Sequence, residues 1–414
     1  VAGNDENGNG LLLKFDSPGN LQWSKVGSSG GSAQYPGAVL QSSDGGYVIA
    51  GMGGPSAANP DFLLQKYDSS GNLLWSKKSG SSQELEQLMD IQQTSDGGYI
   101  GAGYSGAFNN GVFLPFIIKF DSSGTDTWKN IIGYSPIIPG QLNSIKQTQD
   151  GGYIAAGSTL NWGFGGSDVL LIKIDSGGNI TWAKNLGTNK NESANSVIQT
   201  SDGNYVVAGT NDYKDSLIQK YDSSGNLIWS KTAGLSAAVA IISNFVQQTA
   251  DGGYIVGGGG DWFVGGDWVS GHLLKYDNSG NLLWAKAFAP AANGYQSRIY
   301  SGQQTADGGF ILTGDITPFS GVVRKTVLIK TDSGGNISGC GRIFDVTPIV
   351  ASLSLGVNNP PLQNNFNPPS FSVGNYNVDY TNKKLYNCVI DTTKMAPNQI
   401  VDKIIKFVKR QKSL

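Results

Sequence analysis

The stretch KYDSSGNLLWSK at residues 66–77 returns almost unchanged as KYDSSGNLIWSK at residues 220–231. The underlying pattern, Lys-x-Asp-x-x-Gly-Asn-x-x-Trp, occurs seven times with small departures. Its spacing of roughly 50 residues is typical of propeller blades. We call this pattern the tryptophan phrase. Its aspartates are Asp16, Asp68, Asp121, Asp175, Asp222, Asp277 and Asp332.

A second pattern, the glycine phrase, alternates with the first. It consists of an apolar segment, Gln-Thr, Asp-Gly-Gly-Tyr and an apolar segment that ends in Ala-Gly. Asp-Gly-Gly supplies the positive φ angles of a tight hairpin turn, and Asp-Ser-Ser-Gly predicts a type I turn closed by a left-handed glycine. Each phrase therefore predicts a β-hairpin, and two hairpins make a four-stranded antiparallel blade. The turn aspartates of the six clear glycine phrases are Asp44, Asp96, Asp150, Asp202, Asp251 and Asp307.

Seven tryptophan phrases predict an all-β, seven-bladed propeller over residues 1–345. Val1-Ala2-Gly3 matches Val207-Ala208-Gly209, so the chain begins inside a glycine phrase and blade 1 lacks its innermost strand. We expect residues 378–390 to form a closing hairpin that completes blade 1, or a partner subunit to donate that strand. The absence of an initiator methionine predicts a processed N-terminus.

Residues that recur in every copy are expected to build the ring, and function is expected where the copies differ. A tryptophan buries a large area, so we predict that one tryptophan of each blade packs against the next blade. These residues are Trp23, Trp75, Trp128, Trp182, Trp229 and Trp284. We predict that the amide of a glutamine three residues before each turn aspartate joins neighbouring blades near the axis. These residues are Gln41, Gln93, Gln147, Gln199, Gln248 and Gln304.

The seventh tryptophan phrase departs from the others, because Gly339 stands at the tryptophan position and Cys340 follows it. We predict a disulfide from Cys340 to Cys388 that pins the closing segment; two unpaired buried thiols are the alternative. A disulfide implies an oxidising setting, which predicts an extracellular or cell-surface location. Three glycosylation triplets would be acceptors in such a location, at Asn179, Asn191 and Asn336.

The composition of the chain argues against several classes of function. A net charge of -2 with 14% charged residues provides no basic face for nucleic acid, and no apolar run reaches the length of a membrane span. The single histidine, His272, argues against serine–histidine or cysteine–histidine catalysis and against a histidine-based zinc site. No cofactor is expected, although DENGNG at residues 5–10 matches the front half of a calcium loop, with Asp5, Asn7 and Asn9 as ligands. A plain polar loop is the alternative.

The stretch KYDSSGNLLW at residues 66–75 is similar to the tryptophan-docking repeat of the quinoprotein-like propellers, with a turn one residue shorter. The glycine phrase resembles that of secreted bacterial and archaeal repeat proteins, most of which have no assigned function. The resemblance covers residues 1 to about 344 and implies the propeller fold. Quinoprotein dehydrogenases carry a vicinal cysteine pair against their cofactor. Here the two cysteines lie far apart, so quinone chemistry is not implied.

The connections between hairpins vary in length and are expected on the face opposite the turns. They include residues 131–141, 158–168 and 257–271. Aromatic residues outside the repeat gather in them, namely Trp162, Phe164, Trp262, Phe263 and Trp268. Aromatic rings among glycines and aspartates suit stacking on a glycan or burial against another protein. The alternative is a small satellite core that caps the ring.

The end of the chain differs from the repeats. We predict a spacer rich in proline and asparagine and the closing hairpin in residues 346–390, and a tail in residues 391–414. A helical apolar stripe with a basic opposite face predicts a short amphipathic helix in the tail. The stripe consists of Ile400, Val401, Ile404, Ile405 and Val408. We expect the helix to pack on the ring or bind a protein partner, with an anionic membrane surface as the alternative.

These observations predict a secreted or cell-surface propeller that is a binding or structural module and not an enzyme. A glycan or another protein would bind the uneven loop face. One alternative is a subunit of an extracellular filament or surface layer that assembles by strand donation. The other is a polysaccharide lyase or glycosidase that uses loop-face carboxylates.

Overall fold

The computed structural model describes residues 1–4, 9–17, 19–28, 34–53, 61–80, 84–107, 112–132, 139–160, 163–234, 241–264, 267–288, 295–318, 325–337, 343–345, 349–358, 372–375 and 379–381. All regular structure in these residues is β-strand, which confirms the all-β prediction. No helix among them is long and apolar enough to cross a membrane. The predicted helix in residues 391–414 and both cysteines lie outside the described residues.

The strands form antiparallel sheets, numbered in chain order. Sheet 1 holds β1 (Ala2–Asn4), β2 (Gly10–Phe15) and β3 (Leu21–Ser28); sheet 2 holds β4 (Gln34–Gln41), β5 (Tyr47–Gly53), β6 (Asp61–Tyr67) and β7 (Leu73–Gly80). Sheet 3 holds β8 (Glu84–Gln93), β9 (Tyr99–Ala107), β10 (Val112–Phe120) and β11 (Asp126–Ile131); sheet 4 holds β12 (Gly140–Gln147), β13 (Tyr153–Leu160), β14 (Ser167–Ile174) and β15 (Ile180–Gly187). Sheet 5 holds β16 (Glu192–Gln199), β17 (Tyr205–Asn211), β18 (Asp215–Tyr221) and β19 (Leu227–Gly234). Sheet 6 holds β20 (Ile241–Gln248), β21 (Tyr254–Val264), β22 (Asp267–Tyr276) and β23 (Leu282–Phe288); sheet 7 holds β24 (Tyr295–Gln304), β25 (Phe310–Pro318) and β26 (Lys325–Thr331).

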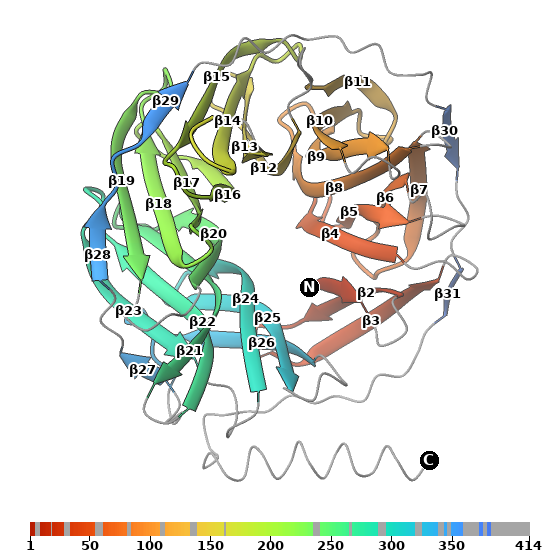
Figure 1. Cartoon of the computed structure of the whole chain (residues 1–414). Helices are drawn as coiled ribbons and strands as arrows, with labels where there is room; N and C mark the ends of the chain where they lie inside the picture. The colour runs from red at the N-terminus through yellow and green to blue at the C-terminus, as the bar shows by residue number, and fades with distance from the viewer. Residues whose placement is uncertain are drawn as a thin grey trace.

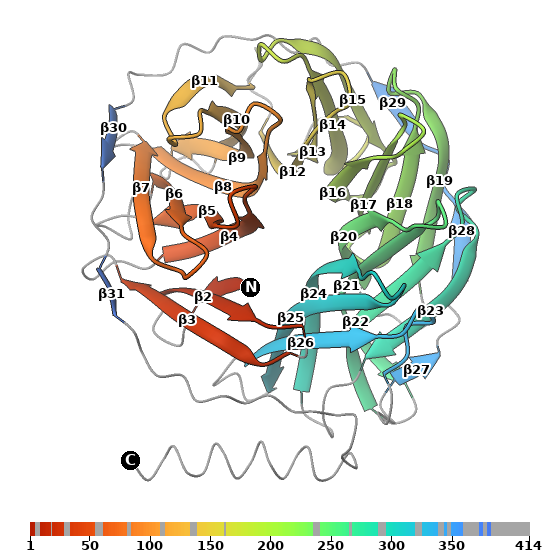
Figure 2. The same cartoon turned by 180° about the vertical axis from the view of Figure 1, so that it is seen from behind.

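The sheets follow one another around a central opening (Figure 1), and the view from behind shows the same order (Figure 2). The first strands of the sheets, such as β12 and β16, lie nearest the centre, and the fourth strands, such as β15 and β19, lie at the rim. A single pairing of Gly259 with Arg298 joins sheets 6 and 7 into one eight-stranded sheet.

The hydrophobic core lies between successive sheets. Between sheets 4 and 5, for example, Val169 and Leu171 of β14 belong to one buried cluster with Val197 of β16 and Val207 of β17. Similar clusters join sheets 1 and 2, 2 and 3, 3 and 4, 5 and 6, and 6 and 7. Each sheet is therefore stabilised by its neighbours, as expected for sheets packed face to face.

The predicted role of the repeated tryptophans is confirmed. The Trp182 ring of sheet 4 lies 6.0 Å, centroid to centroid, from the Tyr205 ring of sheet 5. An ideal Cβ on Gly225, in a turn of sheet 5, would lie 2.9 Å from the Trp182 ring. The tryptophan therefore rests on a backbone that only glycine leaves open. The other five pairs are Trp23–Tyr47, Trp75–Tyr99, Trp128–Tyr153, Trp229–Tyr254 and Trp284–Phe310.

The predicted turns and glutamine bridges are also confirmed. The turn glycines of both phrases have positive φ, for example +80° at Gly203 and +79° at Gly225. The Ser201 N–H in sheet 5 donates to Gln248 Oε1 of sheet 6 at 2.8 Å, so the amide links neighbouring sheets. The same link joins Gln93 to Ser43, Gln147 to Ser95, Gln199 to Gln149 and Gln304 to Ala250.

Five short strands after sheet 7 run back along the rim, and we call them the belt (Figure 1). Each pairs antiparallel with the outermost strand of a different sheet. They are β27 (Ile343–Asp345) on β23, β28 (Ile349–Ser352) on β19, β29 (Gly356–Asn358) on β15, β30 (Ser372–Asn375) on β7 and β31 (Asp379–Thr381) on β3.

The belt shows what the described parts of residues 346–390 form, while the predicted domain boundaries stay a prediction. Residues 349–352 and 356–358 form strands where a spacer was predicted. Residues 379–381 do pair with sheet 1, but beside β3 and not beside β1, which was the edge predicted to be completed. The rest of the predicted hairpin lies outside the described residues. The physical reason is that each outermost strand has an edge of backbone groups available for pairing, and a segment on the rim reaches these edges directly.

Two glycine substitutions separate the cost of the turn from the cost of tryptophan docking. Gly203→Ala meets no atom within 4 Å, so only its left-handed φ is unfavourable, which we expect to cost about 1 kcal/mol. Gly225→Ala has the same φ but its Cβ meets the Trp182 ring, which we expect to add about 1–3 kcal/mol. Chemical denaturation of both variants measures the difference. Equal losses would show that the contact with Trp182 is not tight.

Candidate functional site

The two faces of the ring differ in regularity. Tyr153, which follows one turn, pairs with Ile174, which precedes the other, so both turn types lie at the same end of a sheet. We call this end the turn face. The connections between the second and third strands and between successive sheets lie at the opposite end, which we call the loop face. These connections differ from sheet to sheet, so the loop face is where copies can acquire separate functions.

A lysine supports all six clear turns of the glycine phrase and is buried in five of them, with Lys330 exposed. The lysine that opens each tryptophan phrase binds the turn aspartate of its own sheet at 2.7–2.9 Å. Burial raises the pKa of Asp150, but hydrogen bonds from Thr148 and Lys173 outweigh it and lower that pKa to about 2. The pairs are Lys66–Asp44, Lys119–Asp96, Lys173–Asp150, Lys220–Asp202, Lys275–Asp251 and Lys330–Asp307. They recur in six sheets and are therefore structural.

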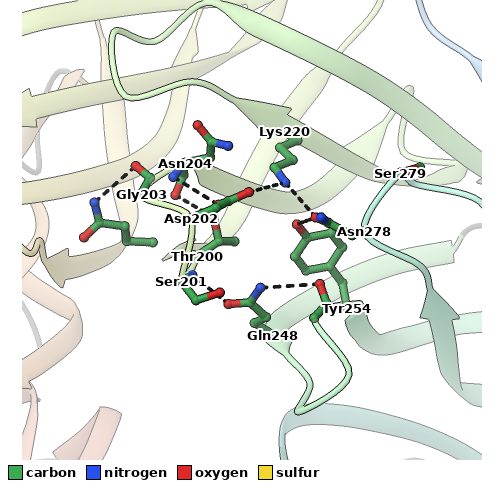
Figure 3. Close-up of polar contacts among 12 residues, drawn as sticks. Thr200, Ser201, Asp202, Gly203, Asn204, Lys220, Gln248, Tyr254, Asn278 and Ser279 are labelled. Carbon is green, nitrogen blue, oxygen red and sulfur yellow. Dashed lines mark hydrogen bonds and ion pairs between the residues drawn. The ribbon is translucent and has the colours of Figure 1, made fainter.

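One turn-face network departs from the repeat (Figure 3). Asn278 stands where the other six tryptophan phrases have serine. Its Oδ1 accepts hydrogen bonds from Lys220 Nζ and from the Tyr254 hydroxyl, both at 2.7 Å, while Lys220 also binds Asp202 at 2.9 Å (Figure 3). These side chains bond to one another, so the network links sheets 5 and 6.

On the loop face, two sheets place a carboxylate across a glycine, and a third has an aspartate at the same position of the repeat. The aspartates stand near the start of the third strand, at Asp61, Asp168 and Asp215. An ideal Cβ on Gly187 would lie 1.6 Å from Asp168 Oδ1, and one on Gly234 would lie 1.9 Å from Asp215 Oδ1. The carboxylate therefore occupies the space of a missing side chain at the end of the fourth strand.

The partner of this carboxylate differs between the sheets. In sheet 2, Lys78 Nζ lies 2.6 Å from Asp61 Oδ2. In sheet 4 the residue at the position of Lys78 is Asn185, so Asp168 lacks the cation that Asp61 has in sheet 2. Asp168 is 0% exposed, its Oδ2 accepts the Phe164 N–H at 2.9 Å, and its Oδ1 has no hydrogen-bond partner. Burial raises the pKa of Asp168.

A second buried acid lies beside Asp168. Glu192, the first residue of β16, is 1% exposed, and its Oε2 would lie 3.0 Å from the same ideal Cβ on Gly187. Thr188 donates its N–H to Oε2 at 3.0 Å and its hydroxyl to Oε1. Burial raises the pKa of Glu192, and the negative charges of Asp168 and Asp212 raise it further against the Thr188 hydrogen bonds. Asp168 and Glu192 are the acid pair of this site.

A strained turn flanks the acid pair. Asp212 and Tyr213 both have φ of +55°, and no other non-glycine residue among those described has positive φ. Asn211 pairs directly with Glu192 across the ladder, is 4% exposed, and its Oδ1 has no hydrogen-bond partner. Asp212 lies 3.3 Å from Lys190, whose side chain is half exposed. Strain and unsatisfied polar atoms together are features that accompany functional sites.

The structure brings few of the predicted ligand-binding residues together. Phe164 is 40% exposed, and its ring lies against Gly356 of the belt, whose ideal Cβ would be 2.4 Å away. Trp262 and Phe263 of β21 run antiparallel to Trp268 of β22, with Phe263 opposite Trp268, but their side chains lie outside the described residues. Trp162 also lies outside them.

The remaining predicted site residues stay untested. Two of the predicted calcium ligands, Asp5 and Asn7, lie outside the described residues, and so do Cys340 and Cys388. The structure describes the third predicted ligand, Asn9. Among the predicted glycosylation sites, Asn179 and Asn336 each donate their side-chain amide to the aspartate of their turn, at 2.9 and 3.2 Å. The third, Asn191, pairs with Ser167 in an isolated bridge.

The burial of the acid pair limits its chemistry. A polysaccharide cannot reach carboxylates that are 0% and 1% exposed, so the pair as placed does not offer a glycosidase geometry. A proton or a small cation needs far less space. Sequence reasoning missed this pair because its members belong to different repeats. The signal that could have found it is the exchange of Lys78 for Asn185 at equivalent positions.

Comparisons with known proteins provide no identity. No protein-family model matches the chain, and no curated protein is significantly similar to it. A protein of unknown function from Dyadobacter fermentans is 10% identical, with 77% of this chain and 97% of that chain covered and a TM-score of 0.45. Sqt1 from Chaetomium thermophilum is 10% identical, with 77% of this chain and 100% of that chain covered and a TM-score of 0.32. At these TM-scores neither likeness supports a conclusion about activity.

We expect Asp168→Asn to stabilise the protein at pH 7 in metal-free buffer, by about 1 kcal/mol. The new amide group can donate to Glu192 Oε2, whereas the carboxylate leaves a buried oxygen unsatisfied and repels Glu192. Because the folded-state pKa of Asp168 is raised, the gain should be absent below the unfolded pKa of about 3.9 and should grow as the pH rises through the folded pKa.

Denaturation midpoints between pH 3 and pH 8 measure this dependence. Asp215→Asn is the matched control, because Asp215 has the same place over a glycine but its residue is less buried. A gain for Asp168→Asn that does not change with pH would contradict the assignment of a raised pKa.

Proposed function

We propose that the chain forms a closed seven-bladed propeller that is a non-enzymatic structural or binding module, secreted or held at the cell surface. The belt is the observation that carries this proposal. Five strands added to the outer edges bind the sheets together from outside, in addition to the cores between them. Edge pairing of this kind adds backbone hydrogen bonds and blocks uncontrolled strand addition, both of which suit a durable scaffold.

The number of blades is supported by the repeated interfaces. Six tryptophans each pack on the following sheet, from the contact of sheet 1 with sheet 2 to that of sheet 6 with sheet 7. A seventh interface, between sheets 7 and 1, would close the ring. The seventh tryptophan phrase has Gly339 at the docking position, so closure there must use other contacts. A disulfide between Cys340 and Cys388 would supply one and would fit a location outside the cytoplasm.

Strand donation between subunits is a second candidate function that the belt favours. The antiparallel pairings of β30 with β7 and of β31 with β3 can form equally well with a neighbouring copy, as in domain swapping. The belt would then join subunits in a filament or layer.

Deleting residues 371–414 tests the belt, because it removes β30 and β31 and keeps β28 and β29. We expect a monomer in which backbone amides of β7 and β3 exchange hydrogen at least about tenfold faster. The amides of β15 and β19 are the internal control and should be unchanged, since their belt strands remain. Long polymers of the full-length protein that the deletion abolishes would replace the scaffold proposal with strand donation.

The loop face is the proposed surface for a glycan or a protein partner. The β21–β22 hairpin brings Trp262, Phe263 and Trp268 to its end through the pairing of its strands. Aromatic residues near the end of one hairpin are suited to stacking on sugar rings.

On a glycan array, we expect Trp262→Ala and Trp268→Ala to abolish binding while the melting temperature stays nearly unchanged. Trp229→Ala is the contrasting control, because Trp229 packs between sheets 5 and 6, and its loss should cost about 3–5 kcal/mol. Strong destabilisation by the hairpin variants would identify their rings as core and remove this surface.

A further inference from the structure

The acid pair on the loop face consists of two buried carboxylates. Sheet 2 has Lys78 beside the corresponding aspartate, but sheet 4 has the uncharged Asn185 at that position. Asp168 Oδ1 and Glu192 Oε2 both approach the small space over Gly187, one from sheet 4 and one from sheet 5. The nearby Lys190 is half exposed and pairs with Asp212. Two like charges in a water-poor site are unfavourable unless a positive charge or a proton joins them.

Sheet 2 shows what the same carboxylate binds when a cation is provided. There Lys78 Nζ lies 2.6 Å from the aspartate that corresponds to Asp168. In sheet 4 the residue at that position is Asn185, whose side chain hydrogen-bonds to Asp168 but carries no charge. The repeat thus contains, within one chain, both the internally neutralised form of the site and a form that lacks its cation.

A separate observation indicates that an oxygen-seeking ligand fits here. Asn211 lies opposite Glu192 on the ladder, so their side chains leave the same face of sheet 5. Asn211 Oδ1 is buried and has no hydrogen-bond partner, and the same is true of Asp168 Oδ1. Backbone oxygens lie next to residues that bind the acid pair. Gly165 donates its N–H to Asp168, and an ideal Cβ on Gly165 would lie 1.9 Å from Lys190 O and 2.9 Å from Thr188 O. Unsatisfied oxygen atoms from carboxylate and amide groups are what a hard cation requires.

We propose that Asp168 and Glu192 bind a calcium ion, with the side-chain amide of Asn211 and backbone carbonyls of the 188–190 connection as further oxygen ligands. Calcium accepts six to eight oxygen ligands in irregular geometry at about 2.3–2.6 Å. Magnesium keeps several waters and demands an octahedron, which suits a buried site of protein oxygens poorly. Zinc prefers nitrogen and sulfur ligands. The described residues hold no group of three or more His, Cys, Asp or Glu side chains that could bind a metal, so a calcium ion here would need amide and backbone oxygens beside the two carboxylates.

The ion would add a link between sheets 4 and 5 to the hydrophobic core that already lies between them. Asp168 holds the Phe164 N–H, and the Phe164 ring lies against Gly356 of β29. Glu192 begins the first strand of sheet 5 and holds Thr188 in the connection from sheet 4. Calcium would therefore stabilise the contact of sheets 4 and 5 and the seat of the belt on sheet 4.

Calorimetric titration of the metal-free full-length protein with CaCl₂ tests the proposal, and titration with MgCl₂ provides the comparison. We expect one calcium ion to bind with a Kd on the order of 10⁻⁴–10⁻³ M, the range of extracellular calcium modules, and magnesium to bind at least tenfold more weakly. Asp168→Asn should weaken calcium binding at least tenfold, whereas Asp215→Asn, the equivalent aspartate of the next sheet, should leave it unchanged.

A second variant keeps the test independent of any loss of folding. Asn185→Lys restores the cation of sheet 2, so we expect a folded protein that no longer binds calcium at this site and whose melting temperature no longer responds to it. Asp5→Asn separates this site from the calcium loop predicted at residues 5–10. The proposal fails if the wild-type protein binds no calcium, if Asp168→Asn and Asn185→Lys bind it as the wild type does, or if Asp5→Asn alone abolishes binding.

Discussion

The docking of a tryptophan onto a glycine turn of the next sheet is the constraint on which the rest of the structure depends. The ring of Trp182 fits only because Gly225 has no Cβ and adopts a left-handed φ of +79°. Trp182 also packs on Tyr205, at the start of the strand that follows the other turn of the same sheet. One side chain thereby contacts both turns of its neighbour, and the same contact recurs between successive sheets.

The sequence predicted these parts of the fold because each depends on a few neighbouring residues. The Asp-Gly-Gly and Asp-Ser-Ser-Gly turns need particular φ angles, and the bridging by Gln248 needs only its fixed distance from the Asp251 turn. The belt could not be predicted in the same way. Strands of three or four residues have no usable hydrophobic period, and their pairing depends on edges that exist only once the sheets are folded.

The acid pair shows a different limit of sequence reasoning. Asp168 looks like Asp61 in an alignment of the repeats, and Glu192 lies in the next blade, so neither residue alone indicates a site. Their proximity follows from the way sheet 5 packs on the end of β15, where Gly187 leaves room for both carboxylates. The aromatic residues of the loops form the stronger pattern in the sequence. In the described part of the structure, however, only Phe164 lies beside the acid pair. Its backbone binds Asp168, whereas its ring lies against Gly356 of the belt.

Comparison with the other sheets shows why the acid pair is unusual in this fold. A single lysine, as in sheet 2, would neutralise Asp168 without any change of backbone, and the tryptophan phrase already accommodates that lysine. Sheet 4 instead contains a buried carboxylate with an unsatisfied oxygen, next to a second carboxylate and a turn with two strained residues. Local departures of this kind are expected where binding and not folding has shaped the residues. The cores on both sides of sheet 4 stabilise it enough to retain such a site.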